Sequence, residues 1–184
     1  FIFFAAFVAL VMALLGNDLS AVVGIALTGF TLYFFRDPYR WVTDAEDAIV
    51  SPADGKIIVL KKIVDDKFVK GEVYKLSIFM DVFNVHVNRV PFAGMVDEII
   101  YTPGKFFSAN SSRGALENET CAVVLRTADN RKLAFVQMAG LIARRIVCWA
   151  EKGEQLTKGE RFGLIRFGSR LDLYLPVDTK FDVK

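Results

Sequence analysis

Two long uncharged apolar runs at the N-terminus constrain the fold of this chain more than any other feature. Phe1 to Leu15 is unbroken, Gly16-Asn17-Asp18 follows as a turn signal, and Leu19 to Phe35 is a second uncharged run. A membrane-spanning helix needs about 20 apolar residues, within a range of about 17–25. The second run reaches that range, so we predict a hydrophobic helical hairpin that either spans the membrane or dips into one leaflet.

Aromatic and basic residues follow this hairpin. Tyr33, Tyr39 and Trp41 are placed to lie at a membrane interface, and Arg36 and Arg40 flank it. Because cytoplasmic flanks of membrane segments are enriched in Lys and Arg, we expect the rest of the chain on the cytoplasmic side of the cell membrane.

The excess of apolar residues is concentrated in the hairpin. Hydrophobic residues make up 53% of the chain and the mean hydropathy is +0.36, which is high for a soluble protein. No later segment is apolar enough to cover two buried helices, which argues against a soluble helical core. We therefore predict that residues 1–41 form a membrane-anchoring hairpin and that residues 42–184 form a separate domain.

Regularly spaced apolar segments with glycine turns predict a β-rich second domain. No periodic helix longer than a turn or two follows Phe35. We expect a mainly β fold, a compact barrel-like or sandwich-like domain. The expected strands are residues 57–60, 73–80, 85–90, 95–101, 121–127, 132–138, 142–149, 161–167 and 170–176.

Charge and cysteine content argue against several classes of function. The net charge of +2 is small and no Lys/Arg run is interleaved with aromatic residues, so we expect no nucleic-acid partner. Cys121 and Cys148 lie in apolar runs without metal-ligand spacing, so we expect buried thiols and no metal site. The sequence leaves a disulfide between them open. The one histidine is His86, so a mechanism that needs an imidazole must use it.

A Gly-Ser pair separates the last two strand-like runs. One run ends at Phe167, the pair is Gly168-Ser169, and apolar and polar residues alternate from Arg170 to Leu175. The simplest interpretation of the pair is a tight turn between strands. A serine hydroxyl beside an open glycine carbonyl could also attack that carbonyl, provided that the chain supplies a base and an orienting acid.

Candidates for the base and the acid lie in the first half of the β-rich domain. His86 shares its expected strand face with Asn84 and Asn88, which suggests a polar lining. Asp54 precedes Gly55 in a turn that leads into a strand. From the residues alone, both also fit purely structural roles, as a hydrogen-bonded strand histidine and a turn aspartate.

Several short motifs, each weak alone, occur together in a specific order and spacing that covers nearly the whole chain. In this combination they resemble phosphatidylserine decarboxylase, specifically its short branch with a small membrane anchor. The motifs are Phe34-Phe35-Arg36-Asp37-Pro38, Ser51-Pro52-Ala53-Asp54-Gly55, the segment from Asn84 to Pro91, the segment from Gln137 to Ile146, and Phe167-Gly168-Ser169.

The resemblance implies a proenzyme that cuts itself at the bond between Gly168 and Ser169. The products would be a β chain of residues 1–168 and an α chain of residues 169–184, which stay together as partners. By the same resemblance, the hydroxyl of Ser169 attacks the carbonyl of Gly168 and Ser169 then becomes a pyruvoyl group, the cofactor.

The resemblance also implies residue roles and a substrate. His86 would be the base and Asp54 the acid of a Ser-His-Asp arrangement, and His86 would later return a proton to the product. The pyruvoyl carbonyl would form an imine with phosphatidylserine, which loses CO₂ and leaves as phosphatidylethanolamine. Longer-branch members carry two histidines in the middle motif, whereas Arg89 stands at the second position here, so His86 serves both steps or another group takes over one.

A lipid substrate implies a site at the bilayer surface. Arg36, Arg40 and Lys105 are our candidates for binding the phosphodiester of the substrate. The sequence does not decide whether the β-rich domain forms a homodimer.

Three alternatives stay open. A β domain behind a membrane anchor also fits a non-enzymatic barrel-sandwich adaptor, in which Gly168-Ser169 is only a turn. A membrane-tethered serine hydrolase would use Ser169 on an external substrate, although this serine lacks a nucleophile elbow. An ether lipid with the same head group would make the chain an archaetidylserine decarboxylase with the same chemistry.

Overall fold

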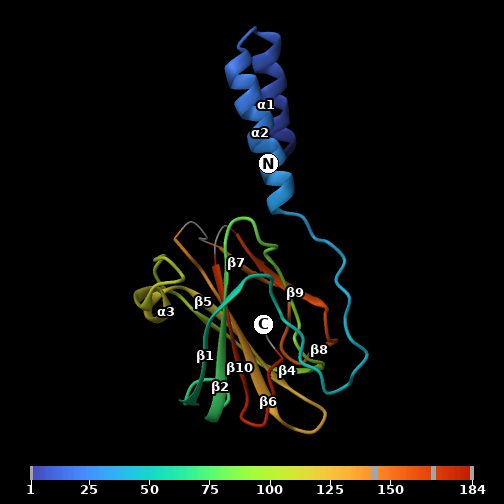
Figure 1. The fold of residues 1–184 in the computed structure, drawn as a ribbon, viewed down its shortest axis with the longest axis vertical. Helices are drawn as coiled ribbons and strands as arrows, with labels where there is room; N and C mark the ends of the chain where they lie inside the picture. The colour runs from blue at the N-terminus through green and yellow to red at the C-terminus, as the bar shows by residue number, and fades with distance from the viewer. Residues whose placement is uncertain (1, 142–144, 167–168, 183–184) are drawn as a thin grey trace. The chain divides into compact units, whose positions relative to one another are not determined.

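The computed structural model describes residues 2–141, 145–166 and 169–182 of the 184-residue chain. The chain divides into two compact units, Phe1–Pro38 and Tyr39–Lys184. Helices form the first unit and antiparallel strands form most of the second (Figure 1). The expected mainly β fold behind an N-terminal helical hairpin is therefore confirmed.

The first unit is a pair of helices, α1 (Ile2–Leu14) and α2 (Asp18–Phe34). Asn17 caps the second helix with its side-chain oxygen. The helices approach closely at Gly24, where an added Cβ would lie 2.7 Å from the Cβ of Ala9, so only glycine fits there. In the described part of the chain, no helix combines the length and the hydropathy that crossing a membrane requires.

The second unit has ten strands and one short helix among its described residues. The predicted segment 142–149 is observed as a strand only over its last part, and residues 142–144 and Phe167 lie outside the described residues. In chain order the elements are β1 (Lys56–Asp65), β2 (Gly71–Met80), β3 (Val87–Arg89), β4 (Gly94–Thr102), α3 (Ser112–Glu117), β5 (Thr120–Arg126), β6 (Lys132–Met138), β7 (Ile146–Cys148), β8 (Gln155–Leu156), β9 (Arg161–Ile165) and β10 (Ser169–Pro176).

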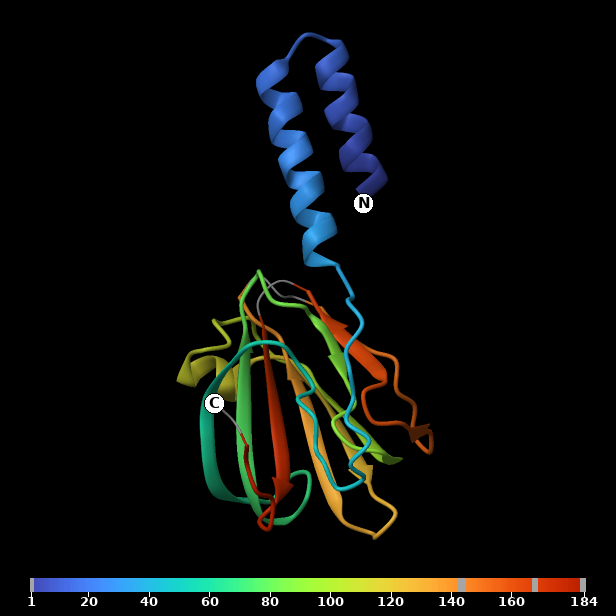
Figure 2. The same cartoon turned by 45° about the vertical axis from the view of Figure 1, so that its right-hand side comes forward.

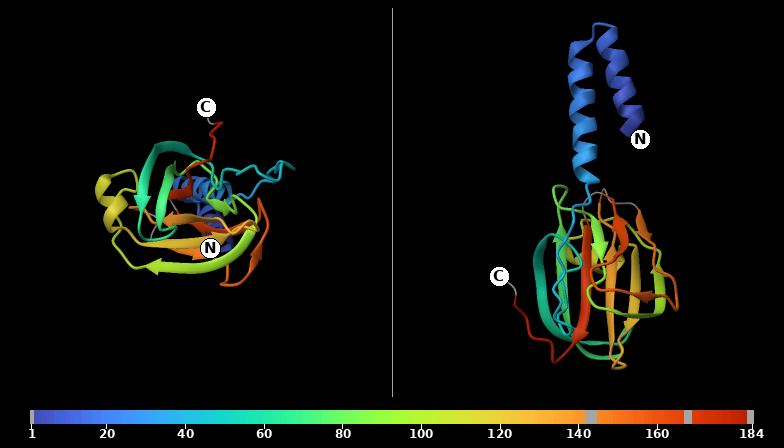
Figure 3. Two further views of the ribbon diagram at one scale, coloured as in Figure 1. Left: turned by 90° about the horizontal axis from the view of Figure 1, so that it is seen from below. Right: turned by 90° about the vertical axis from the view of Figure 1, so that its right-hand side faces the viewer.

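The strands form two sheets. A seven-stranded sheet has the order β1-β2-β10-β6-β5-β4-β8, and a three-stranded sheet has the order β3-β9-β7. The large sheet is strongly curved (Figure 3), and apolar side chains from both sheets share one core. Figure 2 shows the last strand, β10, between β2 and β6, so the end of the chain supplies a central strand.

The position of β10 explains its sequence pattern. Side chains alternate between the two faces of a strand, and Leu171, Leu173 and Leu175 point into the shared core. Ser169 lies two residues before Leu171 and is therefore on the same face of the strand, so its hydroxyl also points inward. Every residue of β10 before Pro176 is buried, because both faces of the strand are covered and both of its edges are paired.

Candidate active site

Ser169 is the first residue of β10 and has no exposed surface. It lies opposite Met80, the last residue of β2, and its Oγ is 4.0 Å from the Met80 sulfur. Gly168, the other half of the predicted scissile bond, lies outside the described residues. The structure thus places the Ser169 hydroxyl, the predicted nucleophile, inside the protein at one end of the core.

A small polar layer closes the core at this end. The amide nitrogen of Asn88 lies 3.6 Å from the Met80 sulfur, and Gln137 donates a 2.9 Å hydrogen bond to the Asn88 side-chain oxygen. All of these side chains are buried, and the Oε1 of Gln137 has no hydrogen-bond partner among the described residues. A neutral layer that contains one unsatisfied acceptor therefore lies beside Ser169.

Sequence reasoning missed Met80 and Gln137 as site residues. Met80 looks like any apolar strand end, and only its pairing with Ser169 across the sheet reveals its position. Gln137 gave a usable signal, because it is a polar residue at an inward position of β6, in line with the core residues Leu133 and Phe135.

His86 directly precedes β3 and is almost fully buried, with 2% of its surface exposed. Its Nδ1 lies 3.0 Å from the backbone carbonyl of Asn84. A carbonyl can only accept, so Nδ1 donates a hydrogen to it, and in the neutral imidazole the lone pair that a base needs is then on Nε2.

The backbone ties His86 to the segment that leads into Ser169. The N–H of Ile165, the last residue of β9, donates a 3.3 Å hydrogen bond to the His86 carbonyl. Ser169 follows four positions later in the chain. The structure therefore brings the chain's one imidazole and the predicted nucleophile to the same end of the domain.

The other predicted site residues have partners of their own. Asp54 pairs with Arg40 through its Oδ2, at a partly exposed position. Lys105 pairs with Glu117 at 2.8 Å. In the helical unit, Arg36 donates a 2.9 Å hydrogen bond to a backbone carbonyl in the last turn of α2. The roles of Asp54 as acid and of the three cations as phosphate ligands stay predictions.

A polar hollow adjoins the Ser169 end of the sheet. It has a volume of about 530 Å³, and its walls include Phe79, which precedes Met80, and Asn84, which binds His86. Lys56, Asp81 and Asn110 add a cation, a carboxylate and an amide to its lining. Such a mixture can bind a ligand that carries both negative and positive charges.

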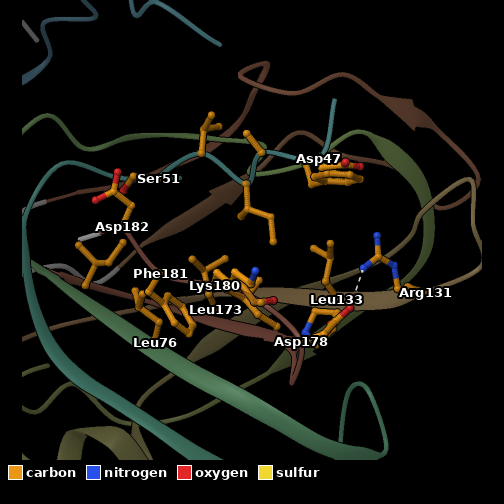
Figure 4. A pocket seen from close by; sticks show the side chains of 18 of the residues that line it. Asp47, Ser51, Leu76, Arg131, Leu133, Leu173, Asp178, Lys180, Phe181 and Asp182 are labelled. Carbon is orange, nitrogen blue, oxygen red and sulfur yellow. Dashed lines mark hydrogen bonds and ion pairs between the residues drawn. The ribbon is translucent and has the colours of Figure 1, made fainter. Parts of the chain in front are cut away.

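A larger cavity of about 890 Å³ lies toward the other end of β10 (Figure 4). Its walls are mainly apolar, with Leu76, Leu133 and Leu173 among them, and Arg131 pairs with Asp178 at its edge. The β10 residues that line it begin at Leu173, about 13 Å along the strand from Ser169 at the usual rise per residue. Ser169 therefore does not line this cavity.

The outer face of β10 carries a buried group of charges. Asp172, which is 1% exposed, contacts Arg170 at 2.5 Å and Lys75 at 2.9 Å. Arg170 also binds Ser77, and Lys75 binds the Tyr174 hydroxyl. Burial opposes the charge on Lys75, yet the Asp172 carboxylate and the Tyr174 hydroxyl raise its pKa above the ordinary value. Because this folded-state pKa is raised, the stabilisation is complete at neutral pH and is lost only as the pH rises through it.

Removing the central charge should loosen β10. We expect Asp172→Asn to lower the free energy of unfolding by about 3–5 kcal/mol, because it leaves two cations near a neutral amide. Thermal or urea unfolding of the uncut chain measures this change. The matched control is Asp178→Asn, an exposed partner of Arg131, which should change stability by less than about 0.5 kcal/mol. Equal effects of the two substitutions would contradict an anchoring role for Asp172.

Comparison with known proteins places the chain in one family. A family model described as phosphatidylserine decarboxylase matches residues 27–184. The chain belongs to the phosphatidylserine decarboxylase family. The decarboxylase match contains every predicted site residue, from Arg36 to Ser169.

Individual members of the phosphatidylserine decarboxylase family are similar over most of their length. A relative from Desulfotalea psychrophila is 60% identical over 183 residues, which is 100% of this chain and 86% of the relative. One from Pelobacter propionicus is 56% identical over 158 residues, which is 86% of this chain and 71% of the relative. One from Citrifermentans bemidjiense is 50% identical over 189 residues, which covers 98% of this chain and 86% of the relative. Each is named a phosphatidylserine decarboxylase proenzyme.

Proposed function

We propose that this chain is a self-cleaving, pyruvoyl-dependent decarboxylase that converts phosphatidylserine to phosphatidylethanolamine. Membership of the family and the proenzyme names of its relatives support the reaction and the processing. The observation that carries the proposal is the place of Ser169. It is buried at the head of a central strand, directly after a glycine in the chain, at the same end of the domain as the one histidine.

Self-cleavage begins with Ser169. Its Oγ attacks the carbonyl carbon of Gly168 while Nε2 of His86 takes the hydroxyl proton. The new C–O bond replaces the C–N bond, and the proton passes to the departing nitrogen, which leaves an ester. Elimination of that ester releases the carboxylate of the first fragment, and hydrolysis with loss of ammonia converts residue 169 into the pyruvoyl group.

The residues around Ser169 fit a small, uncharged carbonyl group. The Met80 thioether contacts the Ser169 hydroxyl, and the amides of Asn88 and Gln137 follow behind that sulfur, without a charged side chain among these contacts. Asn88 and Gln137 can orient a polar group in this setting through their amides. When present, the pyruvoyl group supplies an electron sink for the electrons that CO₂ leaves behind.

The chain's own residues position the substrate and move protons. Burial of residue 169 keeps bulk water from the reacting atoms. His86 is placed to return a proton to the α-carbon once CO₂ has left, since an imidazole titrates near neutral pH. The paired edges of β10 hold the new terminus in place after the backbone is cut, because β2 and β6 both bind the strand.

A lipid substrate requires contact with a bilayer, and the helical unit supports this part of the proposal. Many of its large apolar side chains are exposed, including Phe3 at 91% and Leu14 at 78%. Such a surface suits lipid. With Arg36 and Arg40 after the hairpin, we place the protein at the cell membrane and its β domain on the cytoplasmic side.

Intact mass under denaturing conditions tests the proposal. We expect two fragments from the purified protein, separated between Gly168 and Ser169. The second should be blocked to Edman degradation and should react with carbonyl reagents. The same material should release CO₂ from phosphatidylserine in mixed micelles, and reduction of its carbonyl should abolish that release. A single full-length species from active protein would contradict the proposal.

A further inference from the structure

Two cysteines from different sheets meet in the core. Cys121 lies on the same face of β5 as the core residues Val123 and Leu125, because side chains two residues apart in a strand share a face. This face is directed toward the three-stranded sheet. Cys148 lies on β7 in that second sheet and packs against the same core. Strands β5 and β7 are in contact, and both cysteines are free thiols.

The two thiols interact and are chemically unequal. A hydrogen bond from Cys121 lowers the pKa of Cys148 to about 7 against the effect of burial, and the N–H of Ala150 adds to this. The same hydrogen bond, with burial, raises the pKa of Cys121. The nearby carboxylates Glu119 and Glu154 oppose ionisation of the pair. Cys148 is thus the reactive thiolate, and the 4% exposed Cys121 is placed to resolve its oxidised form.

The pair adjoins the polar layer beside Ser169. Cys121 is the cross-strand partner of Gln137, and Cys148 is the cross-strand partner of Gly163. Gly163 lies against the Gln137 side chain so closely that an added Cβ would be 2.8 Å from its Nε2. Gln137 is therefore the neighbour of Cys121 and also touches Gly163, the neighbour of Cys148, and its amide binds Asn88.

We propose that Cys121 and Cys148 are a redox-sensitive pair whose oxidation by a peroxide joins the two sheets through a disulfide and slows self-cleavage at Ser169. Covalent linkage of β5 to β7 fixes β5 beside Gln137 and β7 beside Gly163, and this displaces the amides of Gln137 and Asn88, the second of which contacts the Met80 sulfur beside Ser169. The disulfide itself is independent of the proposed function, whereas its effect on cleavage rests on that function.

The oxidation is balanced with hydrogen peroxide as the oxidant. The Cys148 thiolate attacks one peroxide oxygen, the O–O bond breaks, and with one proton a sulfenic acid and water form. The Cys121 sulfur then attacks the sulfenic sulfur, the S–O bond breaks, and the Cys121 proton leaves with the hydroxyl as water. Two thiols and one peroxide thus give one disulfide and two waters, and a dithiol reductant reverses the change.

The first experiment tests the disulfide without reference to activity. The uncut full-length Ser169→Ala chain is treated with hydrogen peroxide and alkylated under denaturing conditions, and its intact mass is then measured. We expect loss of both alkylation sites and of the mass of two hydrogen atoms, reversed by dithiothreitol. Cys121→Ser and Cys148→Ser should form no intramolecular disulfide. Retention of both thiols, or oxidation of Cys148 to the sulfinic acid alone, would overturn the proposal.

The second experiment tests coupling to the site. The wild-type chain is made by cell-free synthesis with or without peroxide, and the appearance of the shorter fragment is followed by mass. We expect peroxide to slow cleavage on the order of tenfold, since small displacements of reacting groups have large effects on rate. Dithiothreitol should restore the rate, and Cys148→Ser should cut equally with and without peroxide. Formation of the disulfide without a change in rate would overturn the coupling, whereas no cleavage under reducing conditions would contradict the proposed function instead.

Discussion

The Ser169→Ala chain is expected to remain one uncut polypeptide without decarboxylase activity. In the proposed mechanism this hydroxyl is the attacking group and residue 169 becomes the pyruvoyl group only after that attack, so the loss of activity should be complete rather than graded. The substitution removes an oxygen whose described contact is the Met80 sulfur at 4.0 Å, so the fold should survive with a change in stability of about 1 kcal/mol or less. Intact mass after prolonged incubation, together with a melting curve, measures both outcomes.

Two further substitutions make this result specific. Ser169→Cys keeps a nucleophile at the same atom position and should still cut, because a thiolate can attack the same carbonyl. Ser112→Ala removes an exposed hydroxyl at the start of α3 and should leave cleavage unchanged. Two fragments from Ser169→Ala would exclude Ser169 as the nucleophile, whatever the melting curve shows.

His86→Ala should slow self-cleavage by about 10²–10⁴-fold, the usual contribution of a positioned general base. His86 is the one imidazole of the chain, and its Nδ1 contact with the Asn84 carbonyl presents Nε2 as the base. The rate of fragment formation after cell-free synthesis measures the effect. Added imidazole should restore part of the rate, because it can enter the space that the truncated side chain leaves.

The same variant separates the two steps that we assign to His86. If the His86→Ala chain cuts at the wild-type rate, His86 is not the base of self-cleavage. Fragments that form normally but do not release CO₂ would restrict His86 to the decarboxylation step. The control is a melting curve that matches that of the wild-type chain, because His86 is buried and its removal could also unfold the site.

Local sequence pattern predicted most of the longer helices and strands, but not the short elements α3 and β8. The alternation from Arg170 to Leu175 predicted a strand with one apolar face, and that strand is β10. The apolar runs before Phe35 predicted the two helices. Helix α3 lies inside the long segment in which we expected no strand, where its six residues are too few to produce a visible helical period.

The sequence did not predict which strands pair, because hydrogen bonds between strands join residues that are far apart in the chain. No local pattern indicates that β10 lies between β2 and β6, or that Met80 is opposite Ser169. The charges on the outer face of β10 were unexpected for the same reason, since the partner Lys75 is supplied by β2.

By itself, the sequence predicted the kind of elements from local periodicity, and it indicated the family from the order of short motifs. The bond at which the chain should cut is a prediction that follows from that family resemblance. Only the tertiary structure decided what surrounds Ser169. It placed the Met80 sulfur against the Ser169 hydroxyl and linked that sulfur to Asn88 and through it to Gln137, gave Nδ1 of His86 to a backbone carbonyl, and paired Asp54 with Arg40. The physical reason is that a buried polar group takes whichever partner the packing of distant segments brings within hydrogen-bond distance.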